Sequence, residues 1–249
     1  MPIEWSYSIV SVVLVSLVSL IGIITIPISE SKLKKTVFLM VSLATGALFG
    51  DAIIHLLPEA FERSTNRVEI SLYTLAGIFV FFVLEKFLGW RHDHVLEHGN
   101  PSHLVGQMNL AADGLHNLID GMLIGASYLV SLRVGIATTA AVVLHEIPHE
   151  IGNFGVLLHA GFGKRRALFF NFLSASLAIV GTIVALVIGE GGKDFSLLML
   201  PITAGGFIYI AGSDLVPELH KDREPLKSLL QFITMSMGVG LMLLLLLLE

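Results

Sequence analysis

The 249-residue sequence contains no cysteine and few charged residues. Without cysteine there can be no disulfide framework and no thiolate metal site, so a transition metal would have to be held by nitrogen and oxygen ligands. Charged residues make up 14% of the chain, whereas ordinary soluble domains have roughly 25%. The net charge of −5 is spread over the connecting segments, and nothing in its distribution indicates a nucleic-acid partner.

Apolar residues are abundant instead, at 54% of the chain with a mean hydropathy of +0.82. Runs of about 20 apolar residues can cross the hydrocarbon layer of a membrane as helices. The sequence therefore predicts an all-α polytopic membrane protein with one transmembrane domain over residues 1–249. We expect eight spans, at 6–28, 36–58, 69–89, 104–130, 133–161, 165–189, 196–218 and 226–248. No basic segment precedes the first run, so we interpret it as a span and not as a cleaved signal peptide.

Lysine and arginine are distributed unevenly between the connections. The odd-numbered connections and their flanks hold 11 of these residues and the even-numbered ones hold 4. The positive-inside rule then predicts that the odd connections are cytoplasmic and that both termini are extracytoplasmic.

The third connection, residues 90–103, is rich in histidine. It carries His92, His94, His98 and His103. We expect a short cytoplasmic loop, which either captures metal weakly or has no role in metal handling.

Two spans end in similar sequences. The second ends in HLLPEAFER (55–63) and the seventh in DLVPELHKDR (214–223). Because these spans run in opposite directions across the membrane, the match is typical of an inverted repeat, as in many secondary transporters. The alternative is that Leu-x-Pro-Glu simply ends helices, since proline disfavours their continuation.

Ionisable residues cluster in three spans, where each costs about 2.5–3.5 kcal/mol unless it has a partner or water. The fourth span contains ADGLHNLIDG, in which Asp113, His116, Asn117 and Asp120 form one helical stripe. The fifth contains HEIPHE, in which His145 and His149 form one stripe and Glu146 and Glu150 another. The second contains Asp51 and His55, again four residues apart.

Imidazole and carboxylate groups are ligands of divalent transition metals. Pairs at i and i+4 place two donors within reach of one ion, and Asp120 and Glu146 could bridge two ions. Within the same motif, Pro148 lacks an amide proton and frees the carbonyl of Leu144, so we expect a kinked or widened helix beside the ligands.

Three other interpretations remain. The His and Glu residues could form structural ion pairs only, or the chain could be a metal sensor without transport activity. The third is an intramembrane metalloprotease, because HEIPH fits the H-E-x-x-H zinc signature, with Asp120 completing the site. Against catalysis, a proline interrupts the motif, the Asp-Gly pair lies upstream of it, and surplus donors would fill the open coordination position that a catalytic zinc needs.

HNLIDG and HEIPHE together resemble the paired signatures of the ZIP (Zrt-, Irt-like) divalent-metal transporters, and HEIPHE is close to the HExPHE form of the LIV-1 branch. GDAIIHLLPE, FVLEKF and GVLLHAGFGKRRALFFN are also similar to that branch. The resemblance implies eight spans in a 3+2+3 arrangement with an inverted repeat. It also implies a homodimer in which the first, fourth, fifth and sixth spans move against a scaffold as an elevator.

The resemblance further implies a binuclear metal site. One position would use His116, Asp120, His145, Glu146 and His149, and its neighbour Asn117, Asp120, Glu146 and His149. Glu150 would be an outer or exit ligand, and Asp51, His55 and Asp113 would line the pathway. Asn153 departs from the pattern, because the branch usually has aspartate there. The expected cargo is Zn²⁺, with Cd²⁺, Fe²⁺ or Mn²⁺ possible, carried into the cytoplasm across a plasma or inner membrane.

Overall fold

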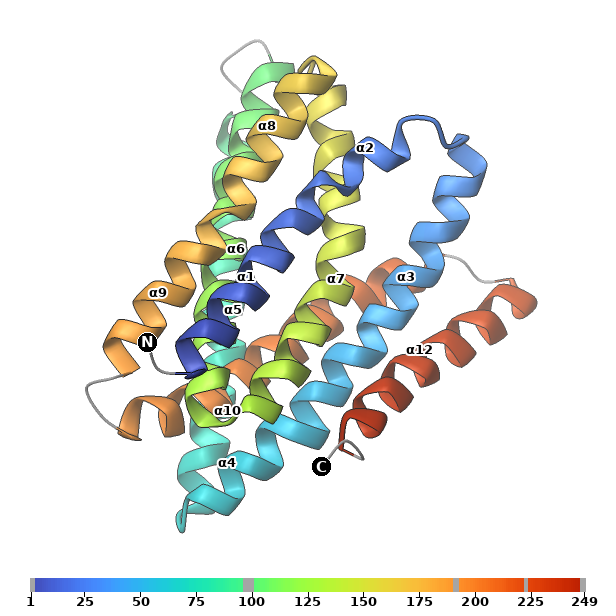
Figure 1. The fold of residues 1–249 in the computed structure, drawn as a ribbon. Helices are drawn as coiled ribbons and strands as arrows, with labels where there is room; N and C mark the ends of the chain where they lie inside the picture. Colours follow the sequence, from blue (N-terminus) through green and yellow to red (C-terminus); the bar gives the residue numbers. More distant parts are fainter. Residues whose placement is uncertain (1–2, 96–100, 190–192, 222–223, 247–249) are drawn as a thin grey trace.

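The computed structural model describes residues 3–95, 101–189, 193–221 and 224–246, and the regular structure in these ranges is helical (Figure 1). The elements follow one another in eight continuous segments. These are α1 (Ile3–Val18), η1 (Ser19–Ile21) and α2 (Gly22–Thr25); α3 (Glu30–Gly50), η2 (Asp51–Leu56) and α4 (Leu57–Arg63); α5 (Arg67–Val95); α6 (Pro101–Val130); α7 (Leu132–His159); α8 (Lys164–Ala175) and α9 (Leu177–Gly189); α10 (Lys193–Tyr209), η3 (Ile210–Leu215) and α11 (Val216–Leu219); and α12 (Pro225–Leu246).

Six of these segments are long and apolar enough to cross a membrane. The fourth and fifth, α6 and α7, have 30 and 28 residues and are long enough, but they carry the polar motifs, which lower their hydropathy. Their crossing therefore stays a prediction.

The helices extend beyond the limits expected from hydropathy. The connection expected at 90–103 is shorter, because α5 continues to Val95 and α6 begins at Pro101. Proline has a backbone angle suited to the first helical position, so Pro101 can begin a helix inside a polar stretch. The position of His98 lies outside the described residues, as do the side chains of His92, His94 and His103.

The two Leu-x-Pro-Glu motifs lie in equivalent local structures. Each follows a π-helical turn, η2 or η3, and its proline, Pro58 or Pro217, is at the start of the next α-helix. A wider turn accommodates the hydrogen bond that proline cannot make. The expected widening at Pro148 is not observed, since α7 remains α-helical from Leu132 to His159. Pro148 is buried inside α7, which runs through it without a π-helical turn.

The second and seventh segments also correspond in how they pack on their neighbouring helices. Gly46 and Gly205 each precede their proline by twelve residues. A Cβ on Gly46 would overlap the backbone of Met235 in α12, and a Cβ on Gly205 would overlap the backbone of Thr74 in α5. The pair α3 and α12 therefore matches the pair α10 and α5. This favours an inverted repeat over a sequence that merely ends helices.

Side-chain hydrogen bonds connect the first, fourth, fifth and sixth segments. Ser11 of α1 bonds the hydroxyl of Tyr128 in α6 (2.7 Å), and Ser16 donates to the carbonyl of Ala175 at the end of α8 (2.9 Å). Thr182 of α9 donates to the carbonyl of Gly121 in α6 (2.8 Å), and Asn153 of α7 donates to Asp113 of α6 (2.6 Å). We call these four segments the inner group.

We call the other four segments the outer group, in which hydrogen bonds join the second and seventh segments to α12, and α5 packs closely on α10. His55 contacts the carbonyl of Met242 in α12 (2.9 Å), and Gln231 of α12 donates to the carbonyl of Leu219 (2.8 Å). Figure 1 shows α3 and α12 side by side at one edge of the molecule.

The close helix contacts can be tested with two glycines of α12. A Cβ at Gly238 would overlap the carbonyl oxygen of Leu43, whereas one at Gly240 would meet nothing within 4 Å. We expect Gly238→Ala to destabilise the protein by about 1–3 kcal/mol. Gly240→Ala should leave stability unchanged or raise it by up to about 1 kcal/mol. Melting temperatures in detergent would measure both, and equal effects would contradict the packing.

Candidate metal centre

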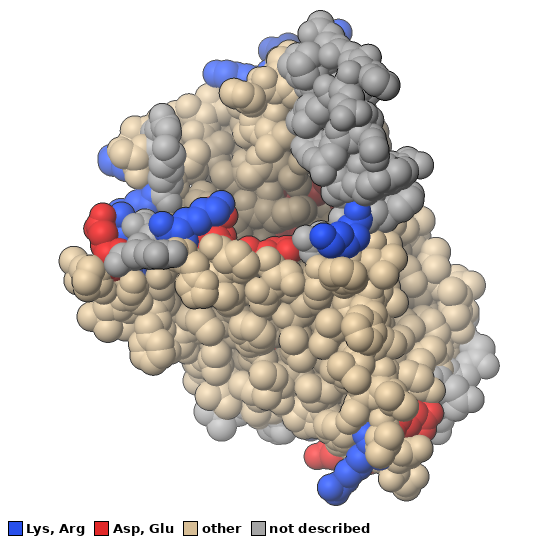
Figure 2. Space-filling model, turned by 180° about the vertical axis from the view of Figure 1, so that it is seen from behind, with Lys and Arg blue, Asp and Glu red and all other residues tan. Residues whose placement is uncertain are grey.

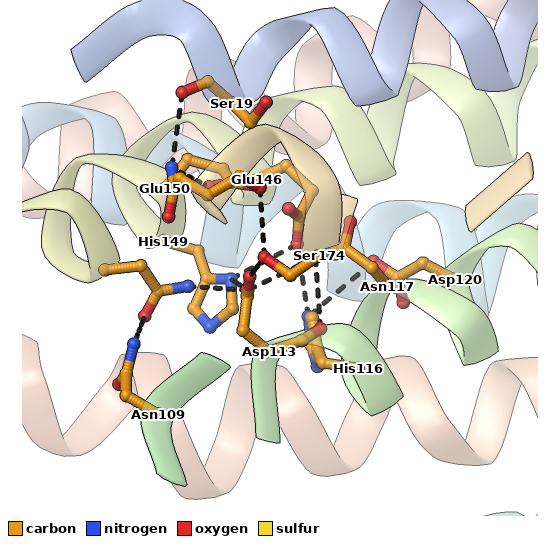
Figure 3. Close-up of polar contacts among 12 residues, drawn as sticks. Ser19, Asn109, Asp113, His116, Asn117, Asp120, Glu146, His149, Glu150 and Ser174 are labelled. Carbon is orange, nitrogen blue, oxygen red and sulfur yellow. Dashed lines mark hydrogen bonds and ion pairs between the residues drawn. The ribbon is translucent and has the colours of Figure 1, made fainter. Parts of the chain in front are cut away.

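Helices α6 and α7 bring four ionisable side chains to one point. A ligand atom from each of His116, Asp120, His145 and Glu146 lies within 4.8 Å of the other three. His116 and Asp120 share one face of α6, and His145 and Glu146 are adjacent in α7. Asp120, His145 and Glu146 are buried, with at most 2% of each residue exposed. The two sequence motifs therefore converge, as expected (Figure 3).

The distances fit a shared ion. His145 Nε2 lies 3.0 Å from Asp120 Oδ2 and 3.4 Å from Glu146 Oε1, and His116 Nε2 lies 3.6 Å and 3.2 Å from the same two atoms. Ligands bound tetrahedrally to zinc at about 2.0–2.1 Å are roughly 3.3 Å apart. Four of the six distances among these atoms are thus close to the spacing of ligands around one zinc ion.

The same atoms lack hydrogen bonds. His116 Nε2, His145 Nε2, Glu146 Oε1 and both oxygens of Asp120 are buried without a hydrogen-bond partner. Charge-assisted hydrogen bonds are about 2.7–2.9 Å long and well aligned. Buried charges left in this state are costly. Structural ion pairing therefore explains the cluster less well than a cation between the donors.

The imidazole of His145 is oriented by the backbone. Its Nδ1 donates to the carbonyl of Ala141 at 3.2 Å, one turn earlier in α7. The proton is thereby held on Nδ1, and Nε2 keeps its lone pair toward the cluster. His149 lies at the edge of the cluster, with Nδ1 3.4 Å from Glu146 Oε1, and its side chain is 36% exposed.

Asn117 and Glu150 lie next to the four-residue cluster. Both are buried, and each has one oxygen, Asn117 Oδ1 or Glu150 Oε1, without a hydrogen-bond partner. Glu150 interacts electrostatically with Glu146 and lies beside Asn117. These two expected ligands are therefore placed to extend the cluster.

Asp113 and Asn153 form a hydrogen-bonded layer beside the cluster. Asn153 Nδ2 donates to Asp113 Oδ1 (2.6 Å), and Asn109 Nδ2 donates to Asn153 Oδ1 (3.2 Å). Asp113 Oδ1 is also 3.7 Å from His149 Nδ1. The amide of Asn153 thus occupies a position where an aspartate would face a second carboxylate.

Asp51 and His55 are not part of the cluster. His55 bonds the backbone of α12, as described above. Asp51 is fully buried, both of its carboxylate oxygens lack a hydrogen-bond partner, and it interacts electrostatically with Thr138 of α7. Thr138 precedes His145 by seven residues, about 10 Å along a helix. Their expected place on the pathway stays a prediction.

Two residues of α8, Asn171 and Ser174, contact the site and are absent from the expected set. Asn171 donates to Glu150 Oε2 and Ser174 donates to Asp113 Oδ2. Neutral Asn and Ser residues are common at helix interfaces in membranes. Their spacing of three residues, in the apolar part of a helix that begins with Lys164, Arg165 and Arg166, was the available signal, and it is weak.

A cavity of about 160 Å³ leads away from the cluster. It lies between α5, α6, α7 and the α10–η3 junction, and His116, Asp113, His149 and Asn153 line it. A space-filling view shows this face hollowed, with acidic groups along the rim and basic groups beside them (Figure 2). The cavity could admit a hydrated ion to the histidines.

The geometry of Glu146 differs from that of a protease base. Its Oε1 lies 3.2–3.4 Å from nitrogens of His116, His145 and His149. In an H-E-x-x-H protease the glutamate activates water and is not a zinc ligand. Glu146 is instead placed among the donors, so the metalloprotease interpretation is not supported.

Comparison with known proteins identifies the family of the chain. Residues 3–102 and 90–246 match the family model described as ZIP zinc transporter. The chain is 29% identical to the mouse protein named zinc transporter SLC39A7, over 96% of this chain and 69% of that protein. It is 34% identical to zinc transporter ZIP13 of Pongo abelii, over 82% and 65% of the two chains. It is 29% identical to the zinc transporter ZIP13 homolog of Drosophila melanogaster, over 96% and 88%.

A single substitution can separate a metal site from an ion pair. Asp120→Asn should weaken zinc binding and raise the melting temperature of the metal-free protein, because it removes a buried charge that lacks hydrogen bonds. Glu224→Gln, which breaks an exposed pair with Lys227, should change neither quantity. A loss of about 3–5 kcal/mol of metal-free stability in Asp120→Asn would instead indicate a structural ion pair.

Proposed function

Since the chain belongs to the ZIP zinc transporter family, we propose that it carries Zn²⁺ across a membrane into the cytoplasm through the cluster between α6 and α7. The family is one of transporters and not of enzymes. Borderline nitrogen and oxygen donors also suit Cd²⁺, Fe²⁺ and Mn²⁺, which are further candidate cargoes.

The observation that carries this proposal is the convergence of unpartnered donors. His116, Asp120, His145 and Glu146 meet inside a predominantly apolar helical body, and their ligand atoms face one another without hydrogen bonds. Several donors of moderate strength suit an ion that must bind and then leave.

We propose that the site is binuclear. Both oxygens of Asp120 are without hydrogen-bond partners, so this carboxylate can bridge two ions. The first ion would use His116, His145, Glu146 and His149. The second would share Asp120 with Asn117 Oδ1, and Glu150 Oε1 is placed to follow it.

The elements that line the cavity indicate the side of the membrane to which it opens. Its lining comes from the N-terminal half of α6, the C-terminal half of α7 and the later part of α5. These ends lead to the connections rich in lysine and arginine, which the positive-inside rule assigns to the cytoplasm. We therefore interpret the conformation as open toward the cytoplasm, with eight membrane-crossing segments and both termini outside.

The opposite side of the cluster is closed by apolar packing. Leu56, Ile124, Val142 and Phe207 belong to one buried core cluster, and the Phe207 ring is 6.4 Å from that of His145. Arg63 at the end of α4 donates to the carbonyl of Val130 at the end of α6 (2.9 Å). This bond links the outer group to the inner group on the side away from the cavity.

An elevator motion is consistent with the two hydrogen-bonded groups. The cluster and its hydrogen-bonded layer lie within the inner group, whose segments are joined by side-chain bonds. Moving this group past the outer group would keep the ligands together. We propose that the outer group is the scaffold and the contact surface of a homodimer in a plasma or inner membrane. The loop histidines would then be free to take up released metal.

Zinc uptake into proteoliposomes tests the central site. His116→Ala and His149→Ala should each lower uptake by more than about tenfold, because each removes a donor facing Glu146 Oε1. His159→Ala is the matched control, since it removes an exposed histidine from the end of α7. Parental uptake in both cluster variants would exclude this site as the route.

Zinc binding should also depend on pH. Histidine binds metal only when neutral, and its pKa is ordinarily about 6.5. Lowering the pH from about 7.5 to 5.5 should therefore weaken zinc affinity. Titration calorimetry at a series of pH values would give the slope of log Kd against pH. An affinity independent of pH would argue against histidine ligands.

A further inference from the structure

Asn171 and Ser174 share one face of α8 and lie against the metal centre without belonging to the cluster. Asn171 is fully buried and Ser174 is 7% exposed. Both donate to carboxylates of the inner group. Each bond occupies one oxygen of its carboxylate, Glu150 or Asp113, and so limits how the rest of that group can be oriented. Helix α8 therefore contributes to the geometry of the site.

Hydrogen bonds connect Ser174 to Asp113 and Asp113 to Asn117. The Ser174 hydroxyl donates to Asp113 Oδ2, while Asp113 Oδ1 and the Asp113 backbone carbonyl accept from Asn117 Nδ2 at 3.2 and 3.1 Å. The nitrogen end of the Asn117 amide is thereby fixed on Asp113. Its oxygen end is buried and without a hydrogen-bond partner, and Figure 3 shows this group of contacts.

Asn171 acts on Glu150 directly. Its Nδ2 donates to Glu150 Oε2 and to the carbonyl of Ser19 in η1 (3.2 Å). One carboxylate oxygen of Glu150 is thereby occupied, and Oε1 is left buried and unpartnered. Asn171 therefore connects three segments at the point where Glu150 needs a fixed orientation.

Asn171 has a further property that a simple packing residue would lack. Its own Oδ1 is buried and has no hydrogen-bond partner. An amide selected only for packing would satisfy both ends, because a buried unpaired carbonyl costs about 1–3 kcal/mol. The orientation of the Asn171 amide is therefore explained by the two hydrogen bonds that its nitrogen donates, to Glu150 and to the carbonyl of Ser19.

We propose that Asn171 and Ser174 are positioning residues for the transported metal. Asn171 holds Glu150 directly, and Ser174 holds Asn117 through Asp113. One oxygen of Glu150 and one of Asn117 thereby stay available to the ion. This inference rests on the proposed function and assigns to α8 a part in metal affinity. Residues that orient metal ligands typically change affinity by about 10–100-fold when removed.

The test uses the full-length protein in detergent, zinc as the probe, and Kd from competition with a chelator. Ser174→Ala and Asn171→Leu should each weaken zinc binding by about 10–100-fold. Ser174→Thr keeps the hydroxyl and should restore most of the affinity. Ser176→Ala is the matched control, because Ser176 Oγ donates only to the carbonyl of Phe172 in its own helix, and it should bind zinc as the parent does.

A second measurement separates positioning from structural support. If Ser174 acts through Asn117, the effect of Ser174→Ala on Kd should largely vanish in an Asn117→Ala background. Glu150→Ala should likewise remove the effect of Asn171→Leu. Variants that bind zinc as tightly as the parent, with only the metal-free melting temperature lowered, would overturn this inference. A parent protein that binds no zinc would overturn the proposed function itself.

Discussion

The constraint on which the structure depends is the free energy of keeping unpaired donors inside an apolar body. Asp120 and Glu146 have oxygens that are buried and lack hydrogen bonds. A fold without a ligand gains nothing from this arrangement, because each such group loses its hydration. The surrounding helices must therefore supply enough packing free energy to hold these donors together. A cation between them would recover much of the electrostatic cost, so the site is stable mainly as a place for an ion.

Close helix packing supplies this support. Gly121 of α6 and Gly181 of α9 each face the backbone of the other helix, and Thr182 bonds the carbonyl of Gly121 (2.8 Å). Lipid offers no hydrophobic force between helices, so small residues and interhelical hydrogen bonds become the means of association. They hold α6 against α9 and so fix the face of α6 that bears His116 and Asp120. The helix pairs α3–α12 and α5–α10 of the outer group use glycine in the same way.

The sequence could predict the helical class and the convergence of HNLIDG with HEIPHE, because helical periodicity and the cost of intramembrane charge both act locally. It could not place His55, which faces α12 through a contact 187 residues away. Nor could it predict the bonds of Asn171 and Ser174, since neutral polar residues are inexpensive in a helix and carry little signal. Pro148 was expected to kink or widen its helix, but the π-helical turns lie before Pro58 and Pro217 and not at Pro148. The presence of a proline in the sequence does not by itself show whether the helix around it will contain a π-helical turn.

Asn153 has an amide nitrogen where an aspartate would have a second carboxylate oxygen, and this difference changes the charge on the wall of the cavity. The branch that the chain resembles usually has aspartate there, and in this fold a carboxylate would lie against Asp113 Oδ1, where the amide now donates at 2.6 Å. Two carboxylates at that distance require a proton or a cation between them. The amide requires neither and leaves a single negative charge on that wall of the cavity. An ion that left the cluster by this route would meet one carboxylate there and not two, so it would be held less strongly than between paired carboxylates.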